Sequence, residues 1–101
     1  MNVYHITPLN NWRKALEYGA YSADSLEKDG FIHCCTKDQT EGVLKMWFRG
    51  EADLLLLEID PTLLSTEIKY EDSHGSGELF PHIYGPLNLD AVVAVTFCAE
   101  R

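Results

Sequence analysis

The sequence predicts an α+β domain, and three observations favour this fold class. The chain has 101 residues, of which 46% are hydrophobic and 24% charged, which suits a single domain over residues 1–101 with one core. Short β-prone runs recur along its whole length. Only two segments place apolar residues at the spacing of an amphipathic helix. About five or six short strands and two helices are therefore expected.

The first elements are a strand and a helix. Residues 3–7 (VYHIT) are apolar and β-branched enough for a strand. Asn10 or Asn11 is then expected to cap a helix that ends at Gly19. The polar segment 21–29 is expected to be irregular, with one helical turn.

A buried strand and the second helix follow. Residues 31–34 (FIHC) are predicted to form the strand. Thr36 and Gln39 have the spacing of a capping box, and Gly50 is a natural terminator, so the second helix is expected between them.

The second half of the chain predicts strands joined by turns. Its most apolar run, residues 53–59, is expected to be the central strand, and Asp60-Pro61 ends it. The remaining expected segments are strands over 68–71, 79–84 and 91–98, a flexible glycine-containing loop over 72–78 and a polar break over 87–90.

Three of the four histidines occupy similar places. His5, His33 and His82 each lie within a short β-prone run and have apolar neighbours. Because strand side chains alternate between two faces, each imidazole can lie opposite the residues that anchor its strand. The pattern indicates a shared site, and His74 in the loop is expected to be solvated.

An imidazole can transfer protons near neutral pH, bind a metal or hold a fixed hydrogen bond. Three chemistries therefore stay open for these histidines. They are a proton-handling site, a set of buried structural histidines in a non-catalytic binding or interaction module, and a three-histidine metal site of a hydrolase. No close pair of the His-x-x-x-His kind favours the metal site, so no metal ligand is assigned.

Other polar residues are candidates for the same site. Glu71 ends a strand before the glycine-containing loop, where a carboxylate can reach into a cleft. Ser25 offers a loop hydroxyl, and Thr36 begins a helix whose first N–H groups can bind an anion. Cys34 and Cys35 are interpreted as small core residues.

Charge and cysteine content restrict the partners. The net charge is −8, and the eight basic residues form no cluster, so the sequence predicts no nucleic-acid partner. We also expect no membrane partner and no leader, because apolar runs such as residues 54–57 are far shorter than a bilayer-spanning helix. Three cysteines with no Cys-x-x-Cys spacing favour a reducing, cytoplasmic compartment. The oligomeric state stays open.

Several motifs together resemble a known family. They are residues 4–7 (YHIT), 19–21 (GAY), 30–34 (GFIHC), 54–60 and 80–87 (FPHIYGPL), with Trp12, Ser25, Leu26 and Gln39. In this order, which covers nearly the whole chain, they resemble the bacterial domain-of-unknown-function 952 family. That resemblance implies an ADP-ribosyltransferase-like fold, a small split mixed or antiparallel sheet with two main helices that grips NAD in a cleft.

The resemblance also implies roles for residues. His33, His82 and Glu71 would be catalytic, and His5, Thr7, Ser25, Thr36 and Tyr84 would bind a small-molecule or nucleotide ligand. NAD is the candidate cofactor or substrate, and a transferase is the implied activity. The chain departs from the pattern of such enzymes in two ways. The strand around His82 has no glutamate in the usual catalytic position, and the phosphate-binding arginines of RNA 2′-phosphotransferases have no evident counterparts.

Overall fold

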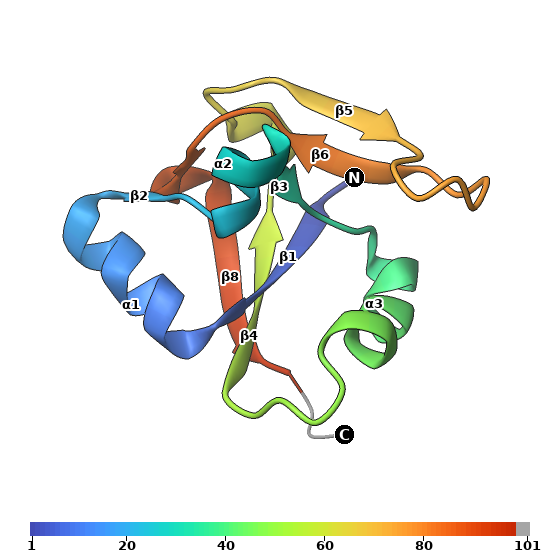
Figure 1. Ribbon diagram of the computed structural model, residues 1–101. Coiled ribbons are helices and arrows are strands. Elements are labelled where there is room, and N and C mark those ends of the chain that lie inside the picture. The colour runs from blue at the N-terminus through green and yellow to red at the C-terminus, as the bar shows by residue number, and fades with distance from the viewer. Residues whose placement is uncertain (99–101) are drawn as a thin grey trace.

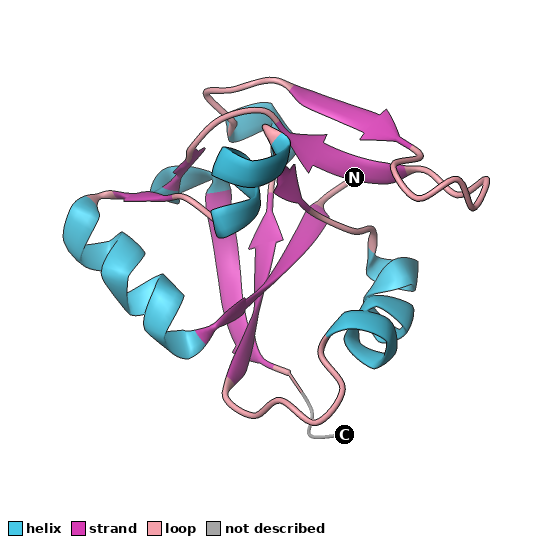
Figure 2. Ribbon diagram, viewed as in Figure 1, coloured by secondary structure: helices cyan, strands magenta, loops and turns pink. Residues whose placement is uncertain are grey.

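The computed structural model describes residues 1–98. Within this range eight strands form three antiparallel sheets, with helices at their flanks (Figures 1 and 2). The strands are β1 (Val3–Pro8), β2 (Ala20–Tyr21), β3 (Ile32–His33), β4 (Leu54–Ile59), β5 (Ile68–Glu71), β6 (Phe80–Ile83), β7 (Leu87–Asn88) and β8 (Val92–Phe97). The helices are α1 (Leu9–Tyr18), α2 (Asp24–Asp29) and α3 (Thr40–Trp47), with 3-10 turns at Lys37–Gln39, Pro61–Leu63 and Leu89–Ala91. The α+β class with antiparallel sheets is confirmed, although residues 1–98 form three sheets, eight strands and three helices where one split sheet, five or six strands and two main helices were expected.

The central sheet has the order β1-β4-β8, so the predicted central strand is confirmed. His5 pairs with Leu57, and this face of the sheet enters the main core. The opposite face carries Ile6 and Leu54, which pack with Leu44 of α3. Helix α3 therefore covers one face of the central sheet.

A second sheet, in the order β3-β6-β5, meets the central one at a single bridge. The backbone N–H of Tyr4 donates to the carbonyl of Cys35, and the N–H of Cys35 donates back to Tyr4, each at 2.8 Å. Residues that directly follow β3 are thereby fixed to β1. The bridge brings His33 near the strand that carries His5.

The helix ends differ in part from expectation. Neither Asn10 nor Asn11 caps α1: Pro8 takes the N-cap position without a side-chain cap, because the helix begins directly after β1. Gly19 ends α1 as predicted, at φ 97°, where a left-handed residue is needed. Gln39 Oε1 accepts from the N–H of Thr36 at 2.9 Å, so the predicted capping contact is present.

Two strand predictions need correction. The strand expected over 31–34 contains only two paired residues, because the bridge to β1 diverts the chain after His33. The break expected over 87–90 contains β7, which pairs with β2. Two-residue strands carry too little periodicity to be recognised in a sequence.

Gly85 provides a test of packing beside β6. A Cβ at this position would lie 2.6 Å from Thr66 Cγ2, so any larger residue must displace the Thr66 side chain. We expect Gly85→Ala to lower the free energy of unfolding by about 1–3 kcal/mol in urea denaturation. The control is Gly42→Ala in α3, where no atom lies within 4 Å and alanine is the better helix former. Equal stability of the two variants would contradict this packing.

Candidate functional site

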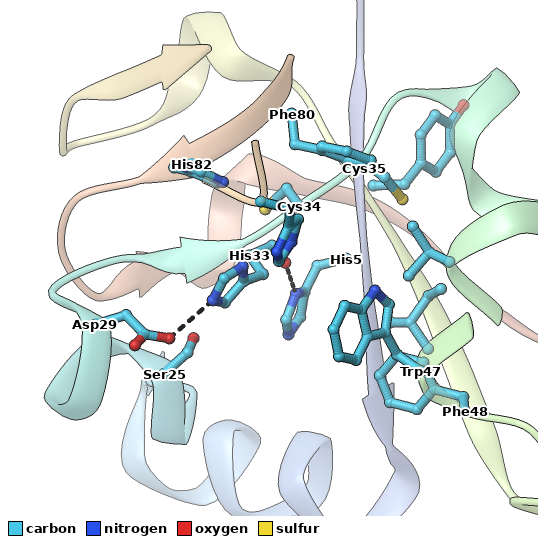
Figure 3. A pocket seen from close by; sticks show the side chains of 14 residues that line it. His5, Ser25, Asp29, His33, Cys34, Cys35, Trp47, Phe48, Phe80 and His82 are labelled. Carbon is cyan, nitrogen blue, oxygen red and sulfur yellow. Dashed lines mark hydrogen bonds and ion pairs between the residues drawn. The ribbon is translucent and has the colours of Figure 1, made fainter. Parts of the chain in front are cut away.

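One pocket collects the histidines. It has a volume of about 450 Å³ and lies over β1, between the side chains of α2 and α3 (Figure 3). This size is typical of small-molecule sites. The lining residues are Tyr4, His5, Ile6, Ser25, Asp29, His33, Cys34, Cys35, Val43, Trp47, Phe48, His74, Phe80 and His82.

His5 forms the base of the pocket, and both of its ring nitrogens have partners. Nδ1 donates to the backbone carbonyl of His33 at 2.6 Å. Nε2 lies 2.8 Å from the hydroxyl of Tyr21, which is also hydrogen-bonded to the Thr7 hydroxyl at 2.9 Å. Burial lowers the pKa of His5 to about 4, so the ring is neutral at pH 7. Since Nδ1 holds the single proton, Nε2 is an acceptor for Tyr21.

His33 is oriented by a carboxylate from α2. Its Nε2 lies 2.9 Å from Asp29 Oδ2 (Figure 3), and both side chains are partly exposed, by 40% and 48%. A pair this exposed contributes at most about 1 kcal/mol to stability. Its main effect is therefore to orient the ring, and Nδ1 of a neutral His33 is left as an acceptor.

His82 is oriented by a second carboxylate. Its Nδ1 donates to Glu71 Oε1 at 2.9 Å, and the hydroxyl of Tyr84 donates to the same oxygen. Phe31 stacks on the imidazole, with ring centroids 4.0 Å apart and planes at 21°. These contacts fix both the position and the tautomer of the ring.

The second nitrogen of His82 has no partner. The residue is 1% exposed, and Nε2 is buried without a hydrogen bond. A buried polar atom without a partner costs about 1–3 kcal/mol. Such an atom in the wall of a pocket can be satisfied by a molecule that enters it.

The electrostatics of Glu71 and Tyr84 are coupled. Hydrogen bonds from Tyr84 and then His82 hold the pKa of Glu71 below its usual value, so the carboxylate is ionised at neutral pH. The same bond raises the pKa of Tyr84, which stays protonated. The ionised Glu71 therefore accepts hydrogen bonds from both Tyr84 and His82.

The two carboxylate-bound histidines are neighbours. The ring centroids of His33 and His82 lie 5.5 Å apart. In the neutral state each presents one nitrogen without a proton, and a protonated ring becomes a donor. The pair can thus accept a proton from one ligand atom and donate one to another.

His74 is exposed, as expected, and it also lies at the pocket. It lines the pocket, with its ring centroid 6.3 Å from that of His33 and 5.4 Å from that of Trp47. Asp72 shapes the loop by accepting hydrogen bonds from the backbone of His74, Ser76 and Gly77. The loop therefore has a defined turn that places His74 beside the pocket.

The remaining predicted site residues fall in different places. Ser25 lines the pocket from α2. Thr7 is fully buried behind His5, and Thr36 lies outside the lining at the start of the turn before α3. Glu71 and Tyr84 reach the pocket only through His82.

Cys34 and Cys35 are confirmed as buried residues, with 5% and 2% exposure. Burial raises the pKa of the Cys34 thiol and raises that of Cys35 to about 12. Both thiols are protonated at neutral pH, so neither is a nucleophile in this state.

Among residues 1–98, no group of three or more His, Cys, Asp and Glu side chains is placed to hold a metal ion. His5 could join such a group only by giving up a hydrogen bond to His33 or Tyr21.

Sequence reasoning missed Asp29 and the aromatic side chains of the pocket lining. Asp29 precedes His33 by four residues, but α2 ends between them, so no periodic signal links the two. Trp47, Phe48 and Phe80 line the pocket, and Trp47 is 60% exposed. Aromatic residues at the end of an amphipathic helix do not reveal whether they face a core or a pocket.

The fold and the site define a small α+β protein with a histidine-lined pocket. A family described as "Protein of unknown function (DUF952)" matches residues 6–95, and the chain belongs to this family. No curated protein matches the chain.

Solved structures share the fold. The crystal structure of protein CC0527 from Caulobacter crescentus is 33% identical, with a TM-score of 0.87, over 96% of this chain and 85% of that chain. A double mutant of CC0527 gives 32% identity and a TM-score of 0.86 over the same shares. The solution NMR structure of CC0527 is 33% identical, with a TM-score of 0.82, over 95% of this chain and 83% of that chain. These similarities support the α+β fold.

No helix within residues 1–98 is long and apolar enough to span a bilayer.

The low pKa of His5 predicts a pH dependence of stability. In the unfolded chain His5 takes up a proton near its ordinary pKa of 6.5, whereas in the folded chain it does so only at a pKa of about 4. The contribution of neutral His5 to the free energy of unfolding is therefore fully present above pH 6.5 and is lost as the pH falls toward 4. Between pH 7.5 and pH 5 we expect a loss of about 2 kcal/mol in the free energy of unfolding, measured in urea.

The pH range from 7.5 to 5 separates the contribution of His5 to stability from that of the carboxylates. Glu71 has a folded pKa below its usual 4.5, so its own contribution is lost only at lower pH. A flat free energy of unfolding between pH 7.5 and 5 would contradict a neutral, buried His5.

Proposed function

We propose that the pocket binds a nucleotide-type small molecule through its base and ribose, and that His82 and His33 transfer protons to and from it. The observation that carries the proposal is the buried Nε2 of His82, which has no partner in the pocket wall. A ligand hydroxyl or N–H group would satisfy it. Glu71 holds the opposite nitrogen, so Nε2 accepts.

The charge of the lining selects the part of the ligand that enters. No Lys or Arg is among the lining residues, and Asp29 is. A pyrophosphate in such a surrounding would lack a counter-charge, and the chain has a net charge of −8. The base and ribose therefore occupy the pocket in this proposal, and the phosphates lie outside it.

The aromatic side chains of the pocket lining suit the base of a nucleotide-type ligand. Trp47 and Phe80 line one part of the pocket, and Asp29 and Ser25 line another. A flat heteroaromatic ring gains from stacking on an aromatic side chain. Ser25 and the two histidines can bind ribose hydroxyls.

Group transfer is the activity that the family resemblance implies. With NAD, the bond between C1′ and the nicotinamide nitrogen breaks, and neutral nicotinamide leaves with the electron pair. A hydroxyl of the acceptor forms a bond to C1′ and gives its proton to Nε2 of His82. Glu71 then stabilises the imidazolium. The free, buried thiols of Cys34 and Cys35 agree with a reducing, cytoplasmic location for such an enzyme.

A matched pair of variants separates a functional from a structural role of the histidines. His82→Leu removes a buried atom without a partner, and the partly exposed Glu71 keeps Tyr84 and water. We expect its free energy of unfolding to stay within about 1 kcal/mol of the wild type. His5→Leu instead leaves the His33 carbonyl and the Tyr21 hydroxyl without a partner, so we expect a loss of about 2–4 kcal/mol.

Urea denaturation at pH 7.5 measures both variants. Equal, large losses would favour the alternative, a module whose histidines are all structural.

Ligand binding can be followed through Trp47. We expect nicotinamide riboside and NAD to quench its fluorescence with Kd values within about tenfold of each other, because the phosphates add little. His82→Leu should weaken both at least about tenfold. Trp12→Phe is the control, since Trp12 packs against the main core and not in the lining.

An assay of nicotinamide release in the same protein–ligand solutions tests whether the protein catalyses transfer. Release that falls in Glu71→Gln supports transfer, whereas tight binding without release identifies a non-catalytic binding module. No quenching by either compound at millimolar concentration would overturn the nucleotide-type ligand.

A further inference from the structure

β8 is an edge strand that lacks the usual protection. It is the last strand in the order β1-β4-β8, and its six residues, VVAVTF, include no charge and no proline. Natural edge strands are normally blunted by charged residues, proline, β-bulges or a covering element. The one register shift of β8 lies at its start, opposite Glu58 and Ile59, and residues 94–97 pair regularly with β4. An edge without these features is a template for another strand.

Its side chains are exposed in a regular pattern. Val93, Val95 and Phe97 are exposed by 50%, 40% and 67%. Leu57 and Leu55, which pair with Val95 and Phe97 on β4, are almost fully buried. The apolar face of the sheet thus continues past its covered part onto β8.

The backbone hydrogen-bonding groups of β8 also support an open edge. The N–H of Cys98 donates to the carbonyl of Leu54 at 2.9 Å, so Cys98 directs its N–H toward β4. Since N–H and C=O groups alternate along an antiparallel strand, Val95 and Phe97 direct theirs away from β4. The residues with exposed side chains therefore also offer the open hydrogen-bonding groups.

The opposite edge of the sheet is engaged. The N–H and C=O of Tyr4 on β1 are both bonded to Cys35. Within residues 1–98, β8 is thus the edge through which the central sheet can grow (Figure 1). A single open edge allows growth by one partner only.

We propose that β8 pairs with β8 of a second copy of this chain, antiparallel across a two-fold axis at Val95. This register places Val95 opposite its own equivalent and Val93 of one copy opposite Phe97 of the other. Two outward backbone groups then form a reciprocal hydrogen-bonded pair, and the exposed apolar side chains cover one another. A strand without charge suits self-association in a chain of net charge −8, because no like charges meet in the interface.

Sedimentation equilibrium and amide hydrogen exchange test the pairing. We expect a mass of twice 11.4 kDa for the wild type. Val95→Lys should give the monomer mass, and Val95→Thr should retain the dimer. Leu63→Lys is the matched control, because Leu63 is 49% exposed and lies outside β8, and it should stay dimeric.

Exchange needs no variant. In the dimer the amide of Val95 should exchange at least tenfold more slowly than at a protein concentration where the monomer prevails. A monomer at every concentration up to millimolar, a dimer unaffected by Val95→Lys, or an open-ended oligomer would each overturn the proposal.

Discussion

The hydrogen bond from His5 Nδ1 to the carbonyl of His33 is the contact on which the site depends. It joins β1 of the central sheet to β3 of the second sheet, and the other nitrogen of His5 binds Tyr21 of β2. Three sheets therefore meet at one neutral imidazole. Because β3 has only two residues, its position is set by such contacts and by its pairing with β6.

The histidines divide into two kinds. Both nitrogens of His5 are used within the protein, and burial keeps it neutral. His33 and His82 each bind one carboxylate through one ring nitrogen, and both residues line the pocket. An exposed pair such as His33–Asp29 adds little stability, so its value lies in orientation. His82 combines orientation with a buried atom that the fold leaves without a partner.

The sequence predicted what depends on local pattern. The central strand over β4, the glycine end of α1 and the placing of the histidines on short strands follow from periodicity and residue type. It did not predict contacts made by two-residue strands or across turns, such as Asp29 with His33, or the place of His74 beside Trp47. Those depend on how separate segments approach in space. The suggestion that Glu71 can reach a cleft came close, since Glu71 accepts a hydrogen bond from the pocket residue His82.

Nitrogen-15 NMR of the imidazole rings tests this division most directly. Spectra of the wild type at pH 7.5, with and without saturating nicotinamide riboside, report each ring nitrogen separately. The account predicts that both His5 and His82 carry their proton on Nδ1, and that the ligand shifts Nε2 of His82 while both nitrogens of His5 stay constant. A ligand that shifts His5 and leaves His82 unchanged would contradict it.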